Sequence, residues 1–429
     1  RYSEPQMDSS TLLIVLSQSG ETADTIAAMK ECQKLGAKTL AIVNVVGSTI
    51  AKLADYTLYT WAGPEIAVAT TKGYTTQLMV LHLFALYAAN TMELLPEPEY
   101  NRLLSALQAL PKMIQKTLDM NGDLSRLAEK YGCKAYATME ELLSDAEIDA
   151  VSVCTANHTH ASVTIAALRA GKHVLCEKPM AISAEECEEM LVEAEKAGKR
   201  LLLGHNQRLT KAHKLAHDLL VKDTIGRVVT FRTTFGHGGP ETWSITPGKG
   251  VWFFDKKQAV MGSMADLGIH KTDLIRFLLD QDVVRTSARV LTLDKRGEDD
   301  ELIAVDDNAM CIYEMSGGTY GTMTTSWSYY GAEDNSTILY GTKGIMRIYD
   351  NPDHSIVIKF RDGVEAMYDV EQIQTNDNQT SSGVIDEYVA AIVENRPSTL
   401  DATGLINSMH AVFASLESSE GNGAAVDVK

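Results

Sequence analysis

The chain has 429 residues, of which 45% are hydrophobic and 22% are charged, a composition typical of soluble globular proteins. Its formal net charge of −18 argues against binding to nucleic acid or to anionic membrane surfaces, which require basic patches. A chain of this length is expected to form two or three domains, and neither a signal peptide nor a membrane span is expected. We therefore expect a cytoplasmic protein whose ligands are small molecules.

The six cysteines are scattered along the chain without the spacing of metal ligands. Most of them lie in apolar elements, so we expect reduced thiols and no metal site.

The first segment has the pattern of a parallel α/β fold. A buried strand is predicted over residues 11–16, followed by a Ser/Thr-rich turn, Ser17–Asp24, and a helix over 23–35. Hydroxyl groups beside the unpaired N–H groups of a helix start can hold a phosphate, although simple helix capping explains the same residues. Strands over 39–45 and 56–60 and a helix over 74–89 complete this segment.

Three motifs of this segment resemble the first sugar-isomerase (SIS) domain of glucosamine-6-phosphate synthase. They are Ser17-Gln-Ser-Gly-Glu-Thr-Ala-Asp-Thr25, Ala41-Ile-Val-Asn-Val-Val-Gly-Ser48 and Glu65-Ile-Ala-Val-Ala-Thr-Thr-Lys-Gly-Tyr-Thr-Thr-Gln77, and the resemblance continues through a linker over 103–130. It implies that Ser17, Gln18, Ser19 and Thr22 bind a sugar phosphate. The second isomerase domain, with its catalytic glutamate, does not follow in the chain, so a complete isomerase is not expected.

Residues 130–222 alternate between short strands and helices. Strands are predicted over 150–155, 173–177 and 199–204, and helices over 139–143, 160–170 and 184–197. This alternation predicts a parallel sheet with helices on both faces. In such a sheet, ligands bind at the carboxyl ends of the strands.

The stretch His173-Val-Leu-Cys-Glu-Lys-Pro179 places an acid and a lysine at such an edge. Lys178 can there hydrogen-bond a substrate hydroxyl or carbonyl, although a solvated loop lysine is the plainer alternative. Asp266 and His270 stand four residues apart in an apolar helical pattern, so both are expected on one face. We predict that His270 acts as a base, that Lys178 is its neighbour and that Asp266 orients the imidazole and favours its charged form; an interior structural histidine is the alternative.

This half resembles the glucose-fructose oxidoreductase, inositol dehydrogenase and MocA family of nicotinamide-dependent sugar dehydrogenases. The resemblance is carried by Asp149-Ala-Val-Ser-Val-Cys-Thr-Ala-Asn-His-Thr-His160, by Ala170-Gly-Lys-His-Val-Leu-Cys-Glu-Lys-Pro179 and by Gly262-Ser-Met-Ala-Asp-Leu-Gly-Ile-His270. It implies NAD or NADP as cofactor and a cofactor site that contains Thr155, Asn157, His160, Glu177, Lys178 and Pro179. Arg208 and Asp273 are predicted to contact the substrate, with a solvent-facing role as the alternative for Arg208. Ala156 departs from the proline usual in the family.

The family's first βαβ unit, with its Gly-x-Gly-x-x-Gly turn, is not found anywhere in the 429 residues. The Ser17–Asp24 turn is a conceivable substitute, but it lacks the glycines that a dinucleotide requires. We predict a composite chain joined near 127–132, in which the strand over 150–155 has an open edge.

The C-terminal half has runs of alternating strands from residue 227 to residue 360 and helices over 384–394 and 404–418. We predict three domains: a partial SIS α/β segment (1–126), an incomplete doubly wound Rossmann domain (127–222) and an α+β domain with a mostly antiparallel open sheet (223–429) that includes a helix over 262–280. The family resemblance implies a homo-oligomer that forms through this sheet.

The resulting functional prediction is an NAD(P)-dependent oxidoreductase that acts on a sugar, a cyclitol or a derivative. Two alternatives stay open: a non-catalytic chain that binds carbohydrate phosphates, and a remnant of the synthase isomerase.

Overall fold

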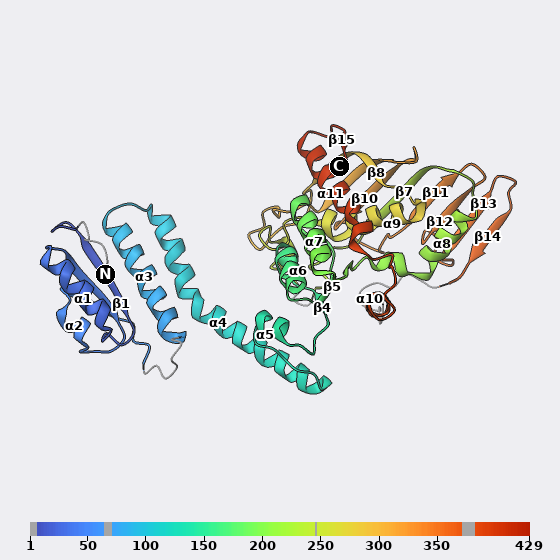
Figure 1. The fold of residues 1–429 in the computed structure, drawn as a ribbon. Coiled ribbons are helices and arrows are strands. Elements are labelled where there is room, and N and C mark those ends of the chain that lie inside the picture. The colour runs from blue at the N-terminus through green and yellow to red at the C-terminus, as the bar shows by residue number, and fades with distance from the viewer. Residues whose placement is uncertain (1–6, 64–70, 245–246, 371–381) are drawn as a thin grey trace. The chain divides into compact units, whose positions relative to one another are not determined.

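The computed structural model describes residues 7–63, 71–244, 247–370 and 382–429. The chain divides into two compact units, unit 1 (residues 1–135) and unit 2 (residues 136–429) (Figure 1). Residues 65–70 of the third SIS-like motif lie outside the described residues, and the predicted boundaries at 126/127 and 222/223 remain predictions. Among the described helices, none has both the length and the apolar character needed to cross a bilayer.

Unit 1 is a three-stranded parallel sheet with helices. Its elements are β1 (Leu12–Ser17), α1 (Ala23–Lys34), β2 (Lys38–Val43), α2 (Thr49–Leu53), β3 (Tyr56–Tyr59), α3 (Thr71–Thr91) and α4 (Glu97–Tyr131). The strand order is β1-β2-β3, and Met29 and Ile50 pack from α1 and α2 against Val15 and Val43 of the sheet. The segment predicted as a linker forms α4, which ends where Gly132 adopts the left-handed conformation.

The first half of unit 2 contains the predicted parallel sheet. Its elements are α5 (Met139–Ser144), β4 (Ala150–Val153), η1 (Asn157–Thr159), α6 (His160–Arg169), β5 (His173–Cys176), α7 (Ala184–Ala197), β6 (Leu201–Leu203), η2 (Asn206–Leu209) and α8 (Lys211–Val221). The strand order is β4-β5-β6. Helices α6 and α7 pack on one face, and α10 (Val384–Val393) packs Tyr388 against Leu175 and Leu202 on the other. Helices on both faces confirm the predicted doubly wound arrangement.

A nine-stranded sheet forms the rest of unit 2. Its strands are β7 (Val228–Gly236), β8 (Val283–Leu291), β9 (Asn308–Met315), β10 (Tyr320–Ser326), β11 (Thr337–Gly341), β12 (Gly344–Ile348), β13 (Ile356–Phe360), β14 (Glu365–Tyr368) and β15 (Val426–Asp427). The order is β14-β13-β12-β11-β7-β10-β9-β8-β15, and only the β7–β10 pair is parallel among the described strands of this sheet. The predicted mostly antiparallel sheet is therefore confirmed, although β14 and β15 were not predicted.

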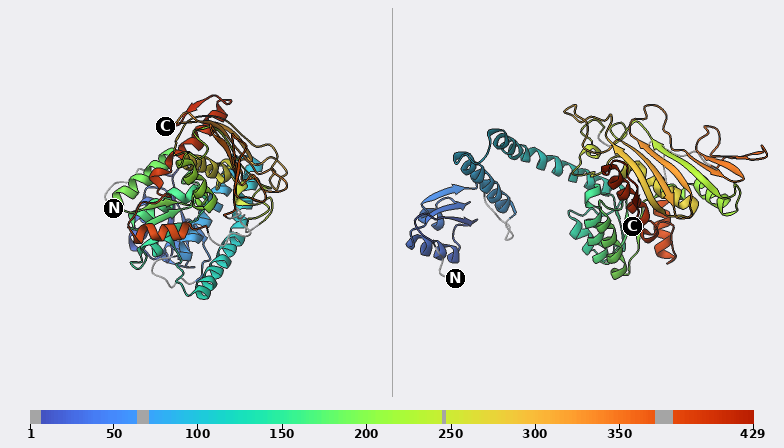
Figure 2. Two further views of the ribbon diagram at one scale, coloured as in Figure 1. Left: turned by 90° about the vertical axis from the view of Figure 1, so that its right-hand side faces the viewer. Right: turned by 90° about the horizontal axis from the view of Figure 1, so that it is seen from above.

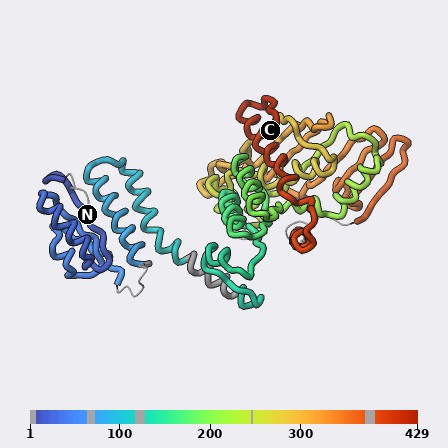
Figure 3. Tube along the Cα trace, viewed as in Figure 1, coloured from blue at the N-terminus to red at the C-terminus, as the bar shows by residue number. Residues whose placement is uncertain are grey.

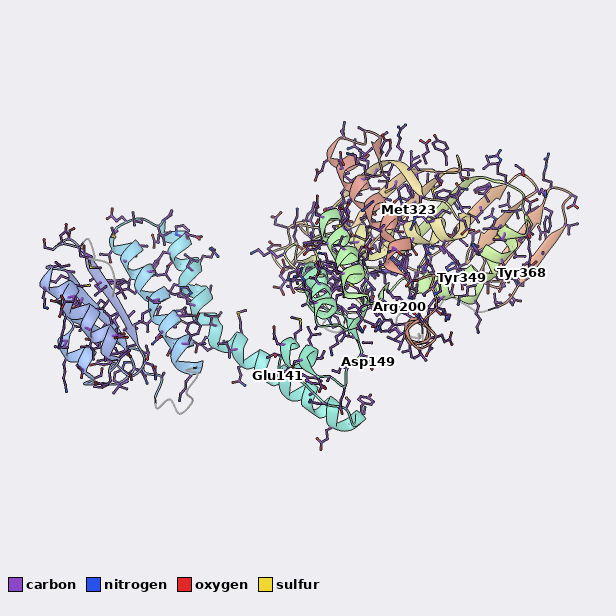
Figure 4. All side chains as sticks on the ribbon, in the orientation of Figure 1. Glu141, Asp149, Arg200, Met323, Tyr349 and Tyr368 are labelled. Atoms are coloured by element: carbon purple, nitrogen blue, oxygen red, sulfur yellow. The ribbon has the colours of Figure 1, made fainter. Side chains whose placement is uncertain are left out.

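Helices cover one face of the nine-stranded sheet. Helix α11 (Ile406–Glu420) packs on β8, and α9 (Ile269–Leu279) packs on β7 (Figure 2). After α11 the Cα trace returns to the sheet, where β15 pairs with β8 and forms the edge strand (Figure 3). In Figure 4, Met323 and Tyr368 mark β10 and β14, and Asp149 and Arg200 mark the amino ends of β4 and β6, opposite the carboxyl edge that holds the candidate site.

Candidate active site at the carboxyl edge of the parallel sheet

A cavity of about 180 Å³ lies where β4 and β5 end. The predicted site residues that line it are Thr155, Asn157, His160, Glu177, Lys178, Pro179 and Asp266. Trp252 and Phe253, whose rings stack with centroids 4.0 Å apart, form another part of its wall. Folding therefore brings together three segments that lie far apart in the sequence, and it does so at the edge where the strand pattern predicted a ligand.

Lys178 and Asp266 form an ion pair at this cavity. The Lys178 Nζ donates to Asp266 Oδ1 at 2.7 Å and to the Asp266 carbonyl oxygen at 2.9 Å. Trp327 Nε1 donates to the other carboxylate oxygen at 3.1 Å. Burial alone would raise the pKa of the Asp266 carboxyl, but the charges of Lys178 and His237 and these hydrogen bonds hold that pKa below its ordinary value. Asp266 is therefore a carboxylate that fixes the lysine.

His270 is buried in the first turn of α9, beside the ion pair. Burial and the charge of Lys178 lower the pKa of His270 well below 6.5, so its imidazole is neutral. Its Nδ1 is buried and has no hydrogen-bond partner among the described residues. His270 is not part of the lining of the cavity described above. A neutral imidazole with a free nitrogen can accept a proton or a hydrogen bond.

The predicted relation between Asp266 and His270 is corrected by these contacts. The sequence predicts that Asp266 orients His270 and favours its charged form. In the structure, the Asp266 carboxylate instead accepts hydrogen bonds from Lys178 and Trp327, and the His270 imidazole is neutral. The segment Met264–Gly268 forms a π-helical turn before α9 rather than an α-helical one. This wider turn changes the angular spacing on which the prediction of a shared helix face depended.

His160 joins the two strand ends that form the cavity. Its Nδ1 lies 2.7 Å from the Pro179 carbonyl oxygen, and its Nε2 lies 2.9 Å from the Thr155 carbonyl oxygen. The side chain is 1% exposed. The Asn157 side-chain amide likewise donates a hydrogen bond to the Ala259 carbonyl oxygen, at 2.9 Å. Both residues therefore hold backbone segments in place around the cavity.

Arg208 and Asp273 pair with each other behind the site. Arg208 Nε and Nη2 donate to the two carboxylate oxygens at 2.6 and 2.8 Å, and Ser408 Oγ donates at 3.0 Å. Arg276 Nη1 lies 3.8 Å away, and His205 Nδ1 lies 3.7 Å away. Neither Arg208 nor Asp273 is among the residues that line the cavity, so their contact with a substrate remains a prediction. The pair fixes η2 to α9, the helix that carries His270.

Asp306 anchors the start of the π-helical turn, and no local sequence signal pointed to it. Its carboxylate accepts from the Gly262 and Met264 N–H groups, both at 2.7 Å, and from Ser263 Oγ at 3.0 Å. Burial raises the pKa of Asp306 above its ordinary value, although these hydrogen bonds oppose the shift. Asp306 thereby sets where the segment that carries Asp266 begins.

Gly262→Ala is expected to destabilise unit 2 by about 1–3 kcal/mol. A Cβ at this position would lie 1.8 Å from the Asp306 carbonyl oxygen, so the turn that carries Asp266 would have to move. Urea unfolding measures the effect. Gly404→Ala is the matched control, because a Cβ at residue 404 meets nothing within 4 Å. Equal stability of the two variants would contradict the tight packing described here.

In unit 1 the predicted phosphate residues lie together at the start of α1. Ser17 Oγ accepts from the Gly20 N–H at 3.0 Å and lies 3.4 Å from Thr22 Oγ1, and Ser19 Oγ accepts from the Glu21 N–H at 3.2 Å. Gly20 has a φ of 67°, which favours glycine. Thr22 makes no side-chain cap bond, so capping does not account for its hydroxyl. The Oε1 atom of Gln18 is buried without a partner among the described atoms.

The parallel sheet with helices on both faces, and with its ionisable groups at the carboxyl edge, places unit 2 in the Rossmann class of α/β proteins. The family model "Oxidoreductase family, NAD-binding Rossmann fold" matches residues 108–205, and the model "GFO/IDH/MocA C-terminal domain" matches residues 213–347. Over these residues the chain belongs to the GFO/IDH/MocA oxidoreductase family. The match begins inside α4, earlier than the predicted residue 130. Residues 2–87 match the SIS domain.

Solved structures similar to this chain show the same fold. A levoglucosan dehydrogenase in complex with NADH and levoglucosan is 22% identical, with a TM-score of 0.62 over 71% of this chain and 87% of that chain. An aldose-aldose oxidoreductase from Caulobacter crescentus is 24% identical, with a TM-score of 0.60 over 71% of this chain and 88% of that chain.

Curated relatives match the first part of the chain. Glutamine–fructose-6-phosphate aminotransferase [isomerizing] from Clostridium tetani is 48% identical over 130 residues, which are 30% of this chain and 21% of that protein. The enzyme of the same name from Symbiobacterium thermophilum is 49% identical over 129 residues. The chain thus spans about a fifth of the length of these relatives.

The family implies a nicotinamide dinucleotide, and the described residues fit only one end of it. The cavity and the Lys178–Asp266 ion pair in its lining suit the reacting ring, and His270, outside that lining, has a buried Nδ1 with no partner among the described residues. The pyrophosphate end needs a glycine-rich turn after a strand beside β4. In the described part of unit 2, β4 pairs only with β5, and the sequence holds no Gly-x-Gly-x-x-Gly.

Proposed function

We propose that unit 2 oxidises an alcohol group of a sugar, a cyclitol or a derivative, with NAD or NADP as the cofactor. The observation that supports this function best is the neutral, buried His270, whose Nδ1 has no partner among the described residues, beside the fixed cation of Lys178. Removing hydrogen from an alcohol needs a base for the hydroxyl proton and a donor for the developing carbonyl oxygen. The bound nicotinamide supplies the hydride acceptor.

Three residues have roles in this proposal. His270 accepts the hydroxyl proton, which its neutral imidazole allows. Lys178 Nζ has three N–H donors; two are directed at Asp266, and the third donates to the substrate oxygen. Asp266 holds the ammonium in place. Lys178 and His270 are thus the proposed catalytic pair, and Asp266 is the residue that positions the lysine.

Turnover of the full chain with NAD or NADP tests this function. A panel of aldoses and cyclitols is supplied, and formation of the reduced cofactor is followed by its absorbance. Turnover with at least one member of the panel is the expected result. Binding of a hexose phosphate without any response to nicotinamide nucleotides would instead favour a non-catalytic sugar-phosphate-binding protein, for which unit 1 offers Ser17, Gln18, Ser19 and Thr22.

We also propose a homo-oligomer that forms through the nine-stranded sheet. Along β9, Ala309 and Cys311 are buried beneath helices, whereas the alternate residues Met310 and Ile312 are 48% and 55% exposed. Tyr320 of the adjacent β10 is 50% exposed. Exposed apolar residues gathered on one sheet face are typical of a protein interface.

Ile312→Glu is expected to convert the oligomer to monomer, because the substitution places a charge in an apolar contact. Sedimentation velocity of the full chain measures the change in mass. Val221→Glu is the control, since Val221 is 66% exposed at the end of α8, away from this sheet face. An oligomer that survives Ile312→Glu, or a wild-type monomer, would contradict the proposal.

A further inference from the structure

The cavity at the carboxyl edge is small. Its volume of about 180 Å³ is below the range of about 300–1,000 Å³ in which sites for drug-sized ligands fall. A dinucleotide consists of two nucleotides and exceeds a drug-sized ligand. The cavity itself therefore encloses less than a whole dinucleotide, and any further part of a bound cofactor would lie outside it.

The charge of the cavity lining does not suit a pyrophosphate. The ionised side chains of the lining are Lys178, Glu177 and Asp266, which carry one positive and two negative charges. The single cation is paired with Asp266 at 2.7 Å. A pyrophosphate carries two further negative charges and is normally held by unpaired N–H groups or by arginine and lysine.

Two other polar side chains of the lining, Asn157 and His160, are already engaged by backbone carbonyls. The amide of Asn157 donates to the Ala259 carbonyl, and both ring nitrogens of His160 face backbone carbonyls. On the far side of β4, where a doubly wound sheet has the strand that leads into the phosphate turn, the described residues place no strand.

The features that suit the nicotinamide ring are nevertheless present. Trp252 and Phe253 offer stacked aromatic rings on the cavity wall, which suit a planar ligand. We infer that the site recognises the N-ribosyl nicotinamide part of the cofactor and not its pyrophosphate–adenosine part, so that nicotinamide mononucleotide binds as tightly as the dinucleotide. This inference rests on the proposed function and concerns which part of the cofactor the same site holds.

Titration of the full chain with NADH, reduced nicotinamide mononucleotide and ADP-ribose tests the inference, with nicotinamide fluorescence and calorimetry as readouts. The two nicotinamide ligands are expected to bind within about threefold of each other, and ADP-ribose is expected not to displace either. One charge-assisted hydrogen bond to a phosphate changes affinity by about tenfold or more. NADH that binds tenfold tighter than the mononucleotide, or displacement by ADP-ribose, would overturn the inference.

Two further measurements locate the binding. Trp252→Ala should weaken both nicotinamide ligands by the same factor, whereas Trp61→Ala, which removes a side chain 76% exposed in unit 1, should weaken neither. Raising the ionic strength from about 0.05 to 0.5 M should leave NADH affinity unchanged, because no charged contact to the phosphates is proposed. A contact between the protein and the phosphates would be weakened by screening. A Trp252→Ala chain that binds both ligands as wild type does would also refute the assignment.

The outcomes separate this inference from the proposed function. Tight NADH binding with turnover, together with weak mononucleotide binding, would refute the inference alone. A chain that binds no nicotinamide compound would refute the inference and the proposed function together.

Discussion

Lys178→Ala is expected to lower turnover by about 10²–10⁴-fold, the usual contribution of a positioned acid–base group. The substitution removes the cation that donates to Asp266 at 2.7 Å and that lies beside His270. It should also raise the pKa of both neighbours. Burial and then Lys178 lower the pKa of His270, and for Asp266 the lysine is the main influence that opposes burial.

Nicotinamide absorbance measures the turnover of this variant, and near-ultraviolet circular dichroism checks that it remains folded. Lys196→Ala is the matched control, because Lys196 is a 66% exposed lysine that pairs with Glu193 on α7. Lys178→Arg keeps the positive charge beside Asp266 but replaces a compact ammonium by a planar guanidinium. This variant should therefore remain folded, and its turnover should stay low. Unchanged turnover of Lys178→Ala would remove Lys178 from the catalytic pair.

Asp273→Ala is expected to lower the free energy of unfolding by about 3–5 kcal/mol, the cost of breaking a buried ion pair. The side chains of Asp273 and Arg208 are 2% and 10% exposed, and Arg276, whose Nη1 lies 3.8 Å from the carboxylate, is equally buried. Removing the carboxylate leaves the Arg208 guanidinium buried without its ion-pair partner. The same change should lower turnover, because η2 would no longer be fixed to the helix that carries His270.

The pH dependence follows from the direction of the pKa shift. Burial alone would raise the pKa of Asp273, but His205, Arg208 and Arg276 outweigh it and hold the pKa well below the ordinary value of 3.8. The carboxylate therefore stabilises the fold above pH 3.8, and this contribution is lost as the pH falls from there through the folded-state pKa. The difference in stability between wild type and Asp273→Ala should be full at pH 7 and shrink only as the pH falls below about 3.8.

Urea unfolding at several pH values provides the test. Asp369→Ala is the control, because the Asp369 side chain is 66% exposed and pairs with the partly exposed His354. A loss at Asp273 no larger than the loss at Asp369 would show that the buried network does not stabilise the fold.

Local sequence patterns determined most of the secondary structure of this protein. The alternation of apolar runs with capped helices predicted β4, β5 and β6, and the Ser183 cap predicted α7 to the residue, since its Oγ accepts from the Glu186 N–H at 3.2 Å. Strand ends also located the candidate site, because parallel strands bring their carboxyl ends to one edge. The periodicity of apolar residues and the capping of helices depend on residues only a few positions apart, so both can be recognised in the sequence itself.

The partners of the site residues were decided only by the tertiary structure. Asp266 meets Lys178, 88 residues away, and Trp327, 61 residues away, instead of the neighbouring His270. Asp306 holds Gly262 from 44 residues away, and the size of the cavity depends on three separate segments. Such contacts result from how whole layers pack against one another, and the spacing of residues along one element carries no information about them.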